Sequence, residues 1–388
     1  EVRRQRQMCI RDRPDYKRQL SSSLWCLPLS CRRTWNWRKI RAICGDQMKY
    51  ALIIFTFVIS VCSAQFGNNQ SMSKTGTTVA QFLKIGMDAR STGMGGAVAG
   101  QKAILSGIYW NPASIAGHKG IGVQFGSYDW LVAMKYQFAI VGIDLGEKGV
   151  IGLSVINLSS PDDLVRTVSE PHGTGEKFST NDLSAGFTYS KMLTDRFSIG
   201  GSFKYIQQNI WHSTARTFAV DVGTLFETPF YGTRLGVSIS NYGGKMRMEG
   251  RDQKISVDPD QDNQGNVEFV NAVYETEYFP LPLFFRVGLS GELIKTESLT
   301  LAYGVDALHP NDNTEYLNFG LELDYRKLIF IRGGLPSFYK QDKIEGPSFG
   351  IGMNYLIDRT STLLTIDYSL SDYGPLGEIK RLNISFNF

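Results

Sequence analysis

The chain has 388 residues, and its 41 Lys and Arg against 37 Asp and Glu give a formal net charge of +4. The charge is unevenly distributed, because residues 1–47 hold 12 basic and 4 acidic residues and Lys49 adds one more basic side chain. The remainder holds 28 basic and 33 acidic residues, a net charge of −5. It contains no basic patch, so nucleic-acid binding is not expected.

Residues 48–64 read MKYALIIFTFVISVCSA. A short basic start, a short apolar core and small residues at the end are typical of a secretory signal peptide. We therefore expect a signal peptide over residues 48–64 with cleavage between Ala64 and Gln65. Residues 1–47 show no helix or strand period and are interpreted as a non-native upstream extension.

Two alternatives to this interpretation stay open. A genuine extension over residues 1–47 would make the apolar run an anchor, although the run is too short for a comfortable membrane span. A lipidated Cys62 would require a small residue before it, where the chain has Val61. All five cysteines precede Gln65, so a chain cleaved there has no disulfide, thiol nucleophile or cysteine metal site.

From Gly120 onward, apolar side chains alternate with polar side chains or glycine. Successive side chains of a strand point to opposite faces, so this alternation predicts strands with one apolar and one polar face. The final segment, LNISFNF, places its apolar residues on one face and Arg381, Asn383, Ser385 and Asn387 on the other. The same pattern occurs in FSIGGSFKY (197–205), LFFRVGLSGEL (283–293) and NFGLELDY (318–325).

Two all-β architectures fit this pattern. A soluble sandwich buries the apolar faces between two sheets, whereas a transmembrane barrel turns them to lipid and keeps the polar faces in its lumen. The polar faces here are rich in Gly, Ser and charge, and the segments approach the roughly ten residues that a tilted membrane strand needs. These features favour the barrel.

Connector lengths support the same choice. Short turns on one side and longer loops on the other are typical of outer-membrane barrels. The expected short connectors are 146–149, 193–196, 230–234, 294–298, 325–327 and 357–361. The expected long ones are 159–179, 211–216, 243–281, 308–315, 337–347 and 371–378. The sequence therefore predicts a transmembrane antiparallel β-barrel of about fourteen strands over residues 119–388, multi-pass in a bacterial outer membrane.

The chain ends on Phe388, at the end of an alternating strand that also carries Phe386. These two residues are interpreted as the C-terminal signal read by the barrel assembly machinery. The alternative is an ordinary last strand, because Phe is common in strands.

Residues 65–118 precede the barrel, and the part over 79–118 is rich in Gly and Ala. Only Phe82 to Arg90 is compatible with a short helix. Gly93, Gly95 and Gly96 permit close backbone approach and positive φ. The third glycine of a dinucleotide fingerprint is absent and no strand precedes the segment, so nucleotide binding is not expected.

The stretch FLKIGMDARSTGMGGAVAG (82–100), followed by IYWNPASIAG (108–117), resembles the opening of the PorV/PorQ family. Members of that family are outer-membrane barrels associated with type IX secretion. They are similar to FadL-type barrels, which have fourteen strands and an N-terminal hatch carrying Asn-Pro-Ala. The rest of the chain matches the family in architecture only.

The resemblance implies that residues 65–118 form an arm and a hatch, or plug, in the lumen. A fourteen-strand barrel leaks unless something fills it, and irregular backbone is tolerated there because lipid does not reach it. We expect Asn111 to hydrogen-bond lumen groups and Arg90 to pair with Glu292, Glu322 or Asp324. The alternative is a periplasmic arm that plugs nothing. The implied hatch residues are Phe82, Arg90, Gly93, Gly95, Gly96, Asn111, Pro112 and Ala113.

Other chemistry finds little support. The four His residues form no i, i+4 pair, no G-x-S-x-G elbow occurs, and neither a zinc site nor an enzyme is expected. Asp258, Asp260 and Asp262 are spaced like a calcium loop, but Asn263 and Phe269 replace its Gly and Glu. A solvated acidic loop is the better interpretation, and no cofactor or metal is expected.

The resemblance predicts a non-enzymatic barrel that serves type IX secretion, with membrane lipid, the type IX translocon and cargo sorting domains as partners. The alternative is a FadL-like channel for hydrophobic small molecules such as fatty acids. A barrel without a transport role is a third interpretation. The longest connector supplies the candidate partner or ligand loop: Tyr274, Tyr278, Phe279, Pro280 and Pro282.

Overall fold

The computed structural model describes residues 74–388 except 231, 260–268, 341–342 and 359–360. The upstream extension, the signal peptide and the Ala64–Gln65 cleavage therefore lie outside the described residues, as do Asp260, Asp262 and Asn263. No helix among the described residues is long and apolar enough to cross a membrane.

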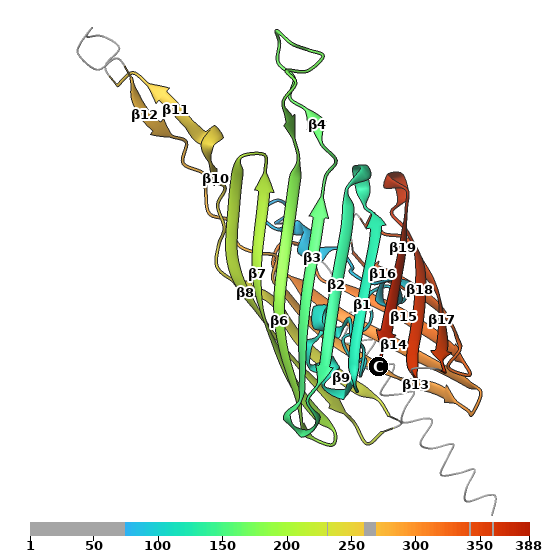
Figure 1. The fold of residues 1–388 in the computed structure, drawn as a ribbon. Coiled ribbons are helices and arrows are strands. Elements are labelled where there is room, and N and C mark those ends of the chain that lie inside the picture. Colours follow the sequence, from blue (N-terminus) through green and yellow to red (C-terminus); the bar gives the residue numbers. More distant parts are fainter. Residues whose placement is uncertain (1–73, 231, 260–268, 341–342, 359–360) are drawn as a thin grey trace, which may run out of the picture. The chain divides into compact units, whose positions relative to one another are not determined.

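The described residues form a barrel of fourteen antiparallel strands (Figure 1). The first strand pairs with the last through Gly122–Gly126 and Asn383–Asn387, and β8 pairs with β9, so the sheet is closed. The strands are β1 (Ile121–Asp129), β2 (Lys135–Asp144), β3 (Val150–Ser159), β6 (Thr180–Thr194), β7 (Phe197–Ile210), β8 (Ser213–Glu227), β9 (Arg234–Gly243), β13 (Phe284–Lys295), β14 (Leu299–Pro310), β15 (Tyr316–Tyr325), β16 (Ile329–Phe338), β17 (Ser348–Ile357), β18 (Thr362–Asp372) and β19 (Glu378–Asn387).

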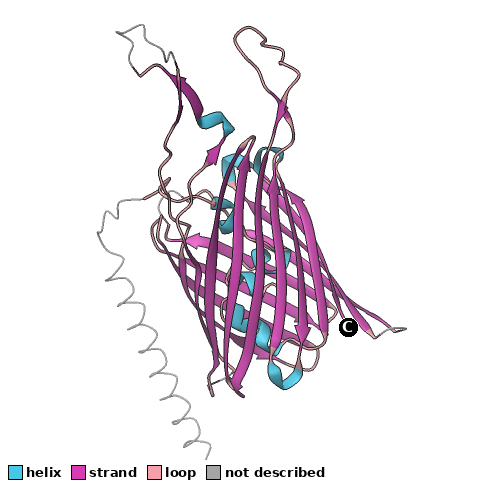
Figure 2. Ribbon diagram, turned by 60° about the vertical axis from the view of Figure 1, so that its left-hand side comes forward, coloured by secondary structure: helices cyan, strands magenta, loops and turns pink. Residues whose placement is uncertain are grey.

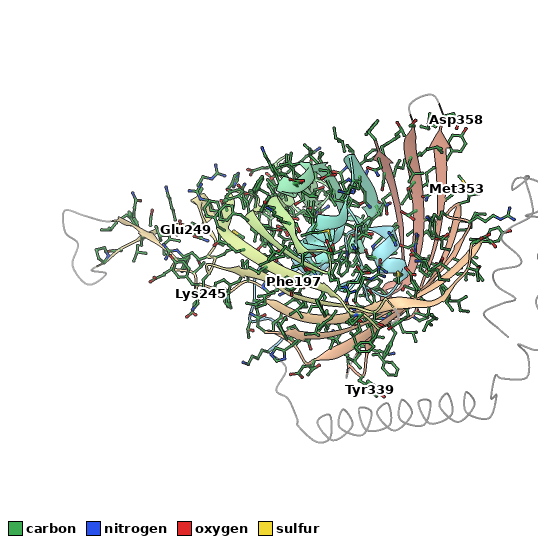
Figure 3. All side chains as sticks on the ribbon, turned by 90° about the horizontal axis from the view of Figure 1, so that it is seen from below. Phe197, Lys245, Glu249, Tyr339, Met353 and Asp358 are labelled. Atoms are coloured by element: carbon green, nitrogen blue, oxygen red, sulfur yellow. The ribbon has the colours of Figure 1, made fainter. Side chains whose placement is uncertain are left out.

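The faces of this barrel are arranged inside out compared with a soluble protein. Arg332 and Arg381 are 3% and 1% exposed, whereas Leu321 on the strand beside Arg332 and Leu382, the residue after Arg381, are 50% and 47% exposed. In Figure 3 the side chain of Met353, which is 51% exposed, points away from the barrel. The sandwich alternative is excluded, because a sandwich would bury these apolar faces.

The connectors differ in length largely as expected, although the predicted short connector from β8 to β9 spans residues 228–233 and is longer than the predicted long ones at 311–315 and 373–377. Two long connectors carry small hairpins of their own: β4 (Asp163–Leu164) with β5 (Lys177–Phe178), and β11 (Lys254–Val257) with β12 (Val270–Val273). The predicted longer connector at 211–216 is wrong. Only Trp211 and His212 join β7 to β8, because Trp211 adopts a left-handed conformation (φ 52°) that closes a tight turn.

Residues 74–118, hereafter the internal segment, lie inside the barrel as short helical turns (Figure 2, cyan). They are η3 (Gln81–Lys84), α3 (Ala89–Gly93), α4 (Gly107–Trp110) and η4 (Pro112–Gly117). The helix expected from Phe82 to Arg90 is therefore broken in two. The first part ends at Lys84, followed by Ile85 in an extended conformation (ψ 122°), and Asp88, also extended (ψ 154°), caps α3 by accepting from Ser91 N.

The smaller elements lie in the connectors. They are β10 (Glu249–Gly250), η5 (Leu131–Ala133), η6 (Gly146–Lys148), η7 (Arg251–Gln253) and η8 (Gly374–Leu376).

Candidate functional site

A ring of inward-facing glycines surrounds the internal segment. A Cβ atom on any of them would come within 3.0 Å of another atom, and at most of them that atom belongs to the internal segment. Several pair directly across the sheet, such as Gly304 with Gly320 and Gly320 with Gly334. We call the following set the glycine belt: Gly122, Gly142, Gly152, Gly200, Gly223, Gly236, Gly288, Gly304, Gly320 and Gly334.

The glycine belt brings two backbones together. Gly304, Gly320 and Gly334 face the backbone of residues 94–97, and Gly200 faces that of Pro112. Only residues without a side chain permit this approach. Gly95 and Gly96 contribute from the other side with positive φ values of 63° and 75°, as the sequence predicted.

Asn111 and Pro112 anchor the C-terminal part of the internal segment. The Asn111 Nδ2 donates to the carbonyls of Ala99 (2.8 Å) and Thr224 (3.1 Å), and Thr224 belongs to β8. Its Oδ1 accepts from Ala113 N at 3.1 Å and caps η4, whose first residue is Pro112. The expected hydrogen bonds of Asn111 to lumen groups are therefore confirmed, as is the turn at Asn-Pro-Ala.

Arg90 makes the second anchor. Its Nη2 lies 2.8 Å from Glu322 Oε1 and its Nε 3.0 Å from Oε2. Of the three predicted partners Glu322 is the one used, whereas Glu292 pairs with Lys295. Arg332 shares Glu322 (2.6 Å) and also binds Asp367 (2.7 Å), so the buried carboxylates are paired.

The internal segment also bounds a cavity of about 620 Å³ between itself and the barrel wall. Its lining comes from residues 79–86, Tyr109 and Trp110 and from the wall at the end that carries the long connectors. Apolar and aromatic side chains form about half of it, and polar or charged side chains form the rest, among them the carboxylates Asp182, Glu345 and Asp372. Its aromatic lining residues are Phe82, Tyr109, Trp110, Trp130, Phe284, Tyr316 and Tyr373.

Arg286 is the unusual member of this lining. It is 5% exposed, its Nη1 donates to the Trp110 carbonyl at 2.7 Å, and its Nε has no hydrogen-bond partner among the described residues. The guanidinium carbon lies 5.1 Å from the Trp110 ring and 6.0 Å from the Phe284 ring. The other two lining cations are paired, Lys84 with Asp312 (3.0 Å) and Lys204 with Asp221 (2.8 Å).

A buried guanidinium without a carboxylate partner is costly unless a counter-ion arrives. No carboxylate of the described residues lies within 4.0 Å of the Arg286 nitrogens. The cavity therefore combines an aromatic lining with a cation that has no carboxylate in direct contact, although the buried Asp306 acts on it electrostatically from further away. Sequence reasoning missed Arg286 because an Arg on the polar face of a strand is unremarkable until the lumen is assembled around it.

Several solved structures are similar to this chain at low identity. The Pseudomonas putida toluene transporter TodX covers 78% of this chain and 97% of its own at 12% identity, with a TM-score of 0.48. The CymD monoaromatic hydrocarbon channel is 12% identical with a TM-score of 0.46, and a Pseudomonas aeruginosa FadL homologue is 10% identical with a TM-score of 0.46. Each similarity covers 78% of this chain and 98% of the other chain. No protein-family model and no curated protein matches the sequence.

At such identities and TM-scores the similarity carries no conclusion about function. The strand count and the closure described above come from the chain's own pairing. The assignment to PorV/PorQ remains a resemblance of residues 82–117.

The remaining predicted residues are scattered. Phe82 is 2% exposed and lines the cavity. Gly93 does not use a positive φ but packs against the backbone of Gly350. Phe386 stacks on Phe125 at 6.3 Å, and Phe388 is 62% exposed. Their role as an assembly signal remains a prediction.

The candidate loop divides into two parts. Tyr274, Tyr278 and Phe279 are 63%, 53% and 43% exposed, so they lie on the surface. Pro280 and Pro282 instead turn toward the lumen. The Pro280 carbonyl accepts from Val79 N (3.0 Å), and the Pro282 carbonyl accepts from Asn241 Nδ2 (2.9 Å). No three metal-ligating side chains cluster among the described residues.

Asp312, in the connector from β14 to β15, holds η3 in place. It accepts from Thr78 Oγ1 (2.6 Å), Gln81 Nε2 (3.1 Å) and Lys84 Nζ (3.0 Å). Burial opposes ionisation of this carboxyl, but the hydrogen bonds from Thr78, Gln81 and Lys84 outweigh it and keep the pKa of Asp312 below its ordinary value of 3.8.

We expect Asp312→Asn to loosen η3. A depressed carboxyl pKa gives stability that is present above pH 3.8 and is lost as the pH falls through the lower, folded pKa. Hydrogen exchange of residues 79–85, corrected for its intrinsic pH dependence, should be slow in the unchanged chain at pH 5, faster at acid pH, and fast in the variant at both. Equal protection of both proteins at pH 5 would show that Asp312 does not hold η3.

Proposed function

We propose that the chain is a non-enzymatic, multi-pass barrel of a bacterial outer membrane that takes up small amphipathic molecules. The ligand would have an apolar body and one anionic group, as a fatty acid or an aromatic acid has. The observation that carries this proposal is the aromatic cavity with the buried, unpaired Arg286 in its wall. The exposed apolar side chains on the outer face of the barrel support its placement in a membrane, where lipid and the barrel assembly machinery would be its partners.

Among the structural neighbours, TodX is a toluene transporter and CymD a monoaromatic hydrocarbon channel. Those names describe the neighbours. For this chain the internal segment would form the floor of the binding cavity, and Pro280 and Pro282 would join the longest connector to it.

Quenching of tryptophan fluorescence tests the proposal. Trp110 and Trp130 line the cavity, whereas Trp211 lies in the β7–β8 turn. We expect bromododecanoic acid to quench the purified chain saturably, and Trp110→Phe and Trp130→Phe each to remove part of that quenching. Trp211→Phe is the control and should leave the saturable part intact. Quenching that depends on Trp211 alone would place the acid in the detergent and refute the proposal.

A second function is favoured by the resemblance of residues 82–117 to the PorV/PorQ family. A barrel of that kind would accompany the type IX translocon or pass cargo with its sorting domain to surface attachment. Affinity pull-down of a loop-tagged chain from solubilised outer membranes, followed by mass spectrometry, separates the two functions. A large translocon barrel or sorting-domain cargo would support secretion, whereas a barrel recovered alone with bound lipid or fatty acid would support uptake.

A further inference from the structure

The glycine belt has no member on β6 or on β17, β18 and β19, although Gly350 of β17 packs against the backbone of Gly93 in α3. Over β17–β19, hereafter the polar sector, Ser348, Ser369 and Asn383 hydrogen-bond to Gly93, Thr92 and Ala89 of α3, whereas Asp367 binds Arg332 behind them. Asn383 Oδ1 accepts from Ala89 N at 2.7 Å, and Thr92 Oγ1 lies 3.0 Å from Ser369 Oγ. The contact between α3 and the wall is therefore made largely by polar side chains.

Cavities lie on both sides of this contact. The cavity of about 620 Å³ described above, hereafter the upper cavity, reaches Thr92, Ser348 and Ser371. A second cavity of about 230 Å³, hereafter the lower cavity, is lined by Arg90, Asp367 and other polar groups. It extends to Asn354, Thr365 and Asn387, near the ends of the strands that carry the short connectors. Within the polar sector, α3 is the element that both cavities border.

The α3 contacts can break without leaving a buried charge unpaired. Glu322 keeps Arg332 (2.6 Å) when Arg90 leaves, and Asp367 keeps both Arg332 (2.7 Å) and Asn383 (3.3 Å). The Arg90 side chain is 32% exposed and borders the lower cavity, where it can be hydrated. The costly loss of one partner of a buried pair is therefore avoided here.

The glycine belt offers no such freedom. At Gly304, Gly320 and Gly334 backbone meets backbone, so moving the internal segment there would open voids in close-packed structure. The polar sector has one such backbone contact, between Gly93 and Gly350, so displacing α3 there disturbs less close packing than moving the rest of the internal segment.

We propose that small polar solutes cross the barrel between α3 and the polar sector, and that displacement of α3 opens this passage. The Arg90–Glu322 pair and the Thr92–Ser369 contact hold it closed. The glycine belt keeps the rest of the internal segment fixed while α3 moves. This inference concerns the route only and does not depend on which molecule the upper cavity binds.

A disulfide across the passage tests it. The five natural cysteines, all before residue 65, are first replaced by serine in the full chain. Thr92→Cys with Ser369→Cys then ties α3 to β18. The matched control is Thr188→Cys with Ser202→Cys, a contact of 2.7 Å within the wall, between β6 and β7, that leaves α3 free.

The readout is osmotic swelling of proteoliposomes in urea, glycerol and arabinose. We expect the oxidised α3–β18 disulfide to reduce swelling to the rate of protein-free liposomes, dithiothreitol to restore it, and the control disulfide to change nothing. Undiminished swelling of the oxidised variant would overturn the proposal, as would a parent chain that passes no solute. If the disulfide does not form, Arg90→Gln carries the test: faster swelling supports the passage, and unchanged swelling overturns it.

Discussion

Replacing Gly334 by valine is expected to displace the internal segment, whereas the same change at the adjacent Gly333 is expected to have little effect. A Cβ at Gly334 would meet the backbone of Met94 and Gly95 closer than any real contact allows, while a Cβ at Gly333 would meet nothing within 4 Å. Inserting methyl groups into a packed core costs about 1–3 kcal/mol. The cost at Gly334 should exceed this, because backbone cannot rotate out of the way.

The measurement is the permeability of cells to a large antibiotic, together with hydrogen exchange of residues 94–97. We expect Gly334→Val to admit the antibiotic and to lose protection, and Gly333→Val to resemble the unchanged chain. Gly304→Val and Gly320→Val, at the neighbouring positions of the belt, should behave like Gly334→Val. Normal exclusion by all three belt variants would mean that the internal segment does not seal the lumen.

The second large effect is expected at Arg286. Replacement by methionine should weaken the binding of an amphipathic carboxylate by roughly tenfold to 150-fold, since a hydrogen bond to a charged group contributes about 1.5–3 kcal/mol. A neutral hydrocarbon of equal size should bind as before. The barrel should remain folded, because the Trp110 carbonyl keeps its hydrogen bond from Ser238 Oγ at 3.1 Å.

Arg332→Met is the contrasting variant. Arg332 is also a buried lumen arginine, but it neutralises Glu322 and Asp367, so its loss should cost about 3–5 kcal/mol of folding stability. Binding by isothermal calorimetry and heat-modifiable electrophoretic mobility separate the two effects. If Arg286→Met bound acids and hydrocarbons with unchanged affinity, Arg286 would not be the anion-binding residue.

Much of the architecture followed from the sequence. The alternation in LNISFNF and NFGLELDY is a local property, because the side-chain period of a strand is fixed by the backbone. Glycine and charge on one face of these strands already indicated a lumen rather than a dry core. The strand number followed from the spacing of the turns, and the error at Trp211 arose because a single left-handed residue shortened the connector.

The sequence by itself therefore determined the strands, the inside-out orientation of the barrel and the turn at Asn111–Pro112. Tertiary structure alone decided which residues meet across the lumen. Gly334 reaches Gly95, Arg90 selects Glu322 over Glu292, and Arg286 remains without a carboxylate. The physical reason is that these contacts join positions more than 150 residues apart, and their distances depend on how the closed sheet curves around the internal segment, which no local pattern encodes.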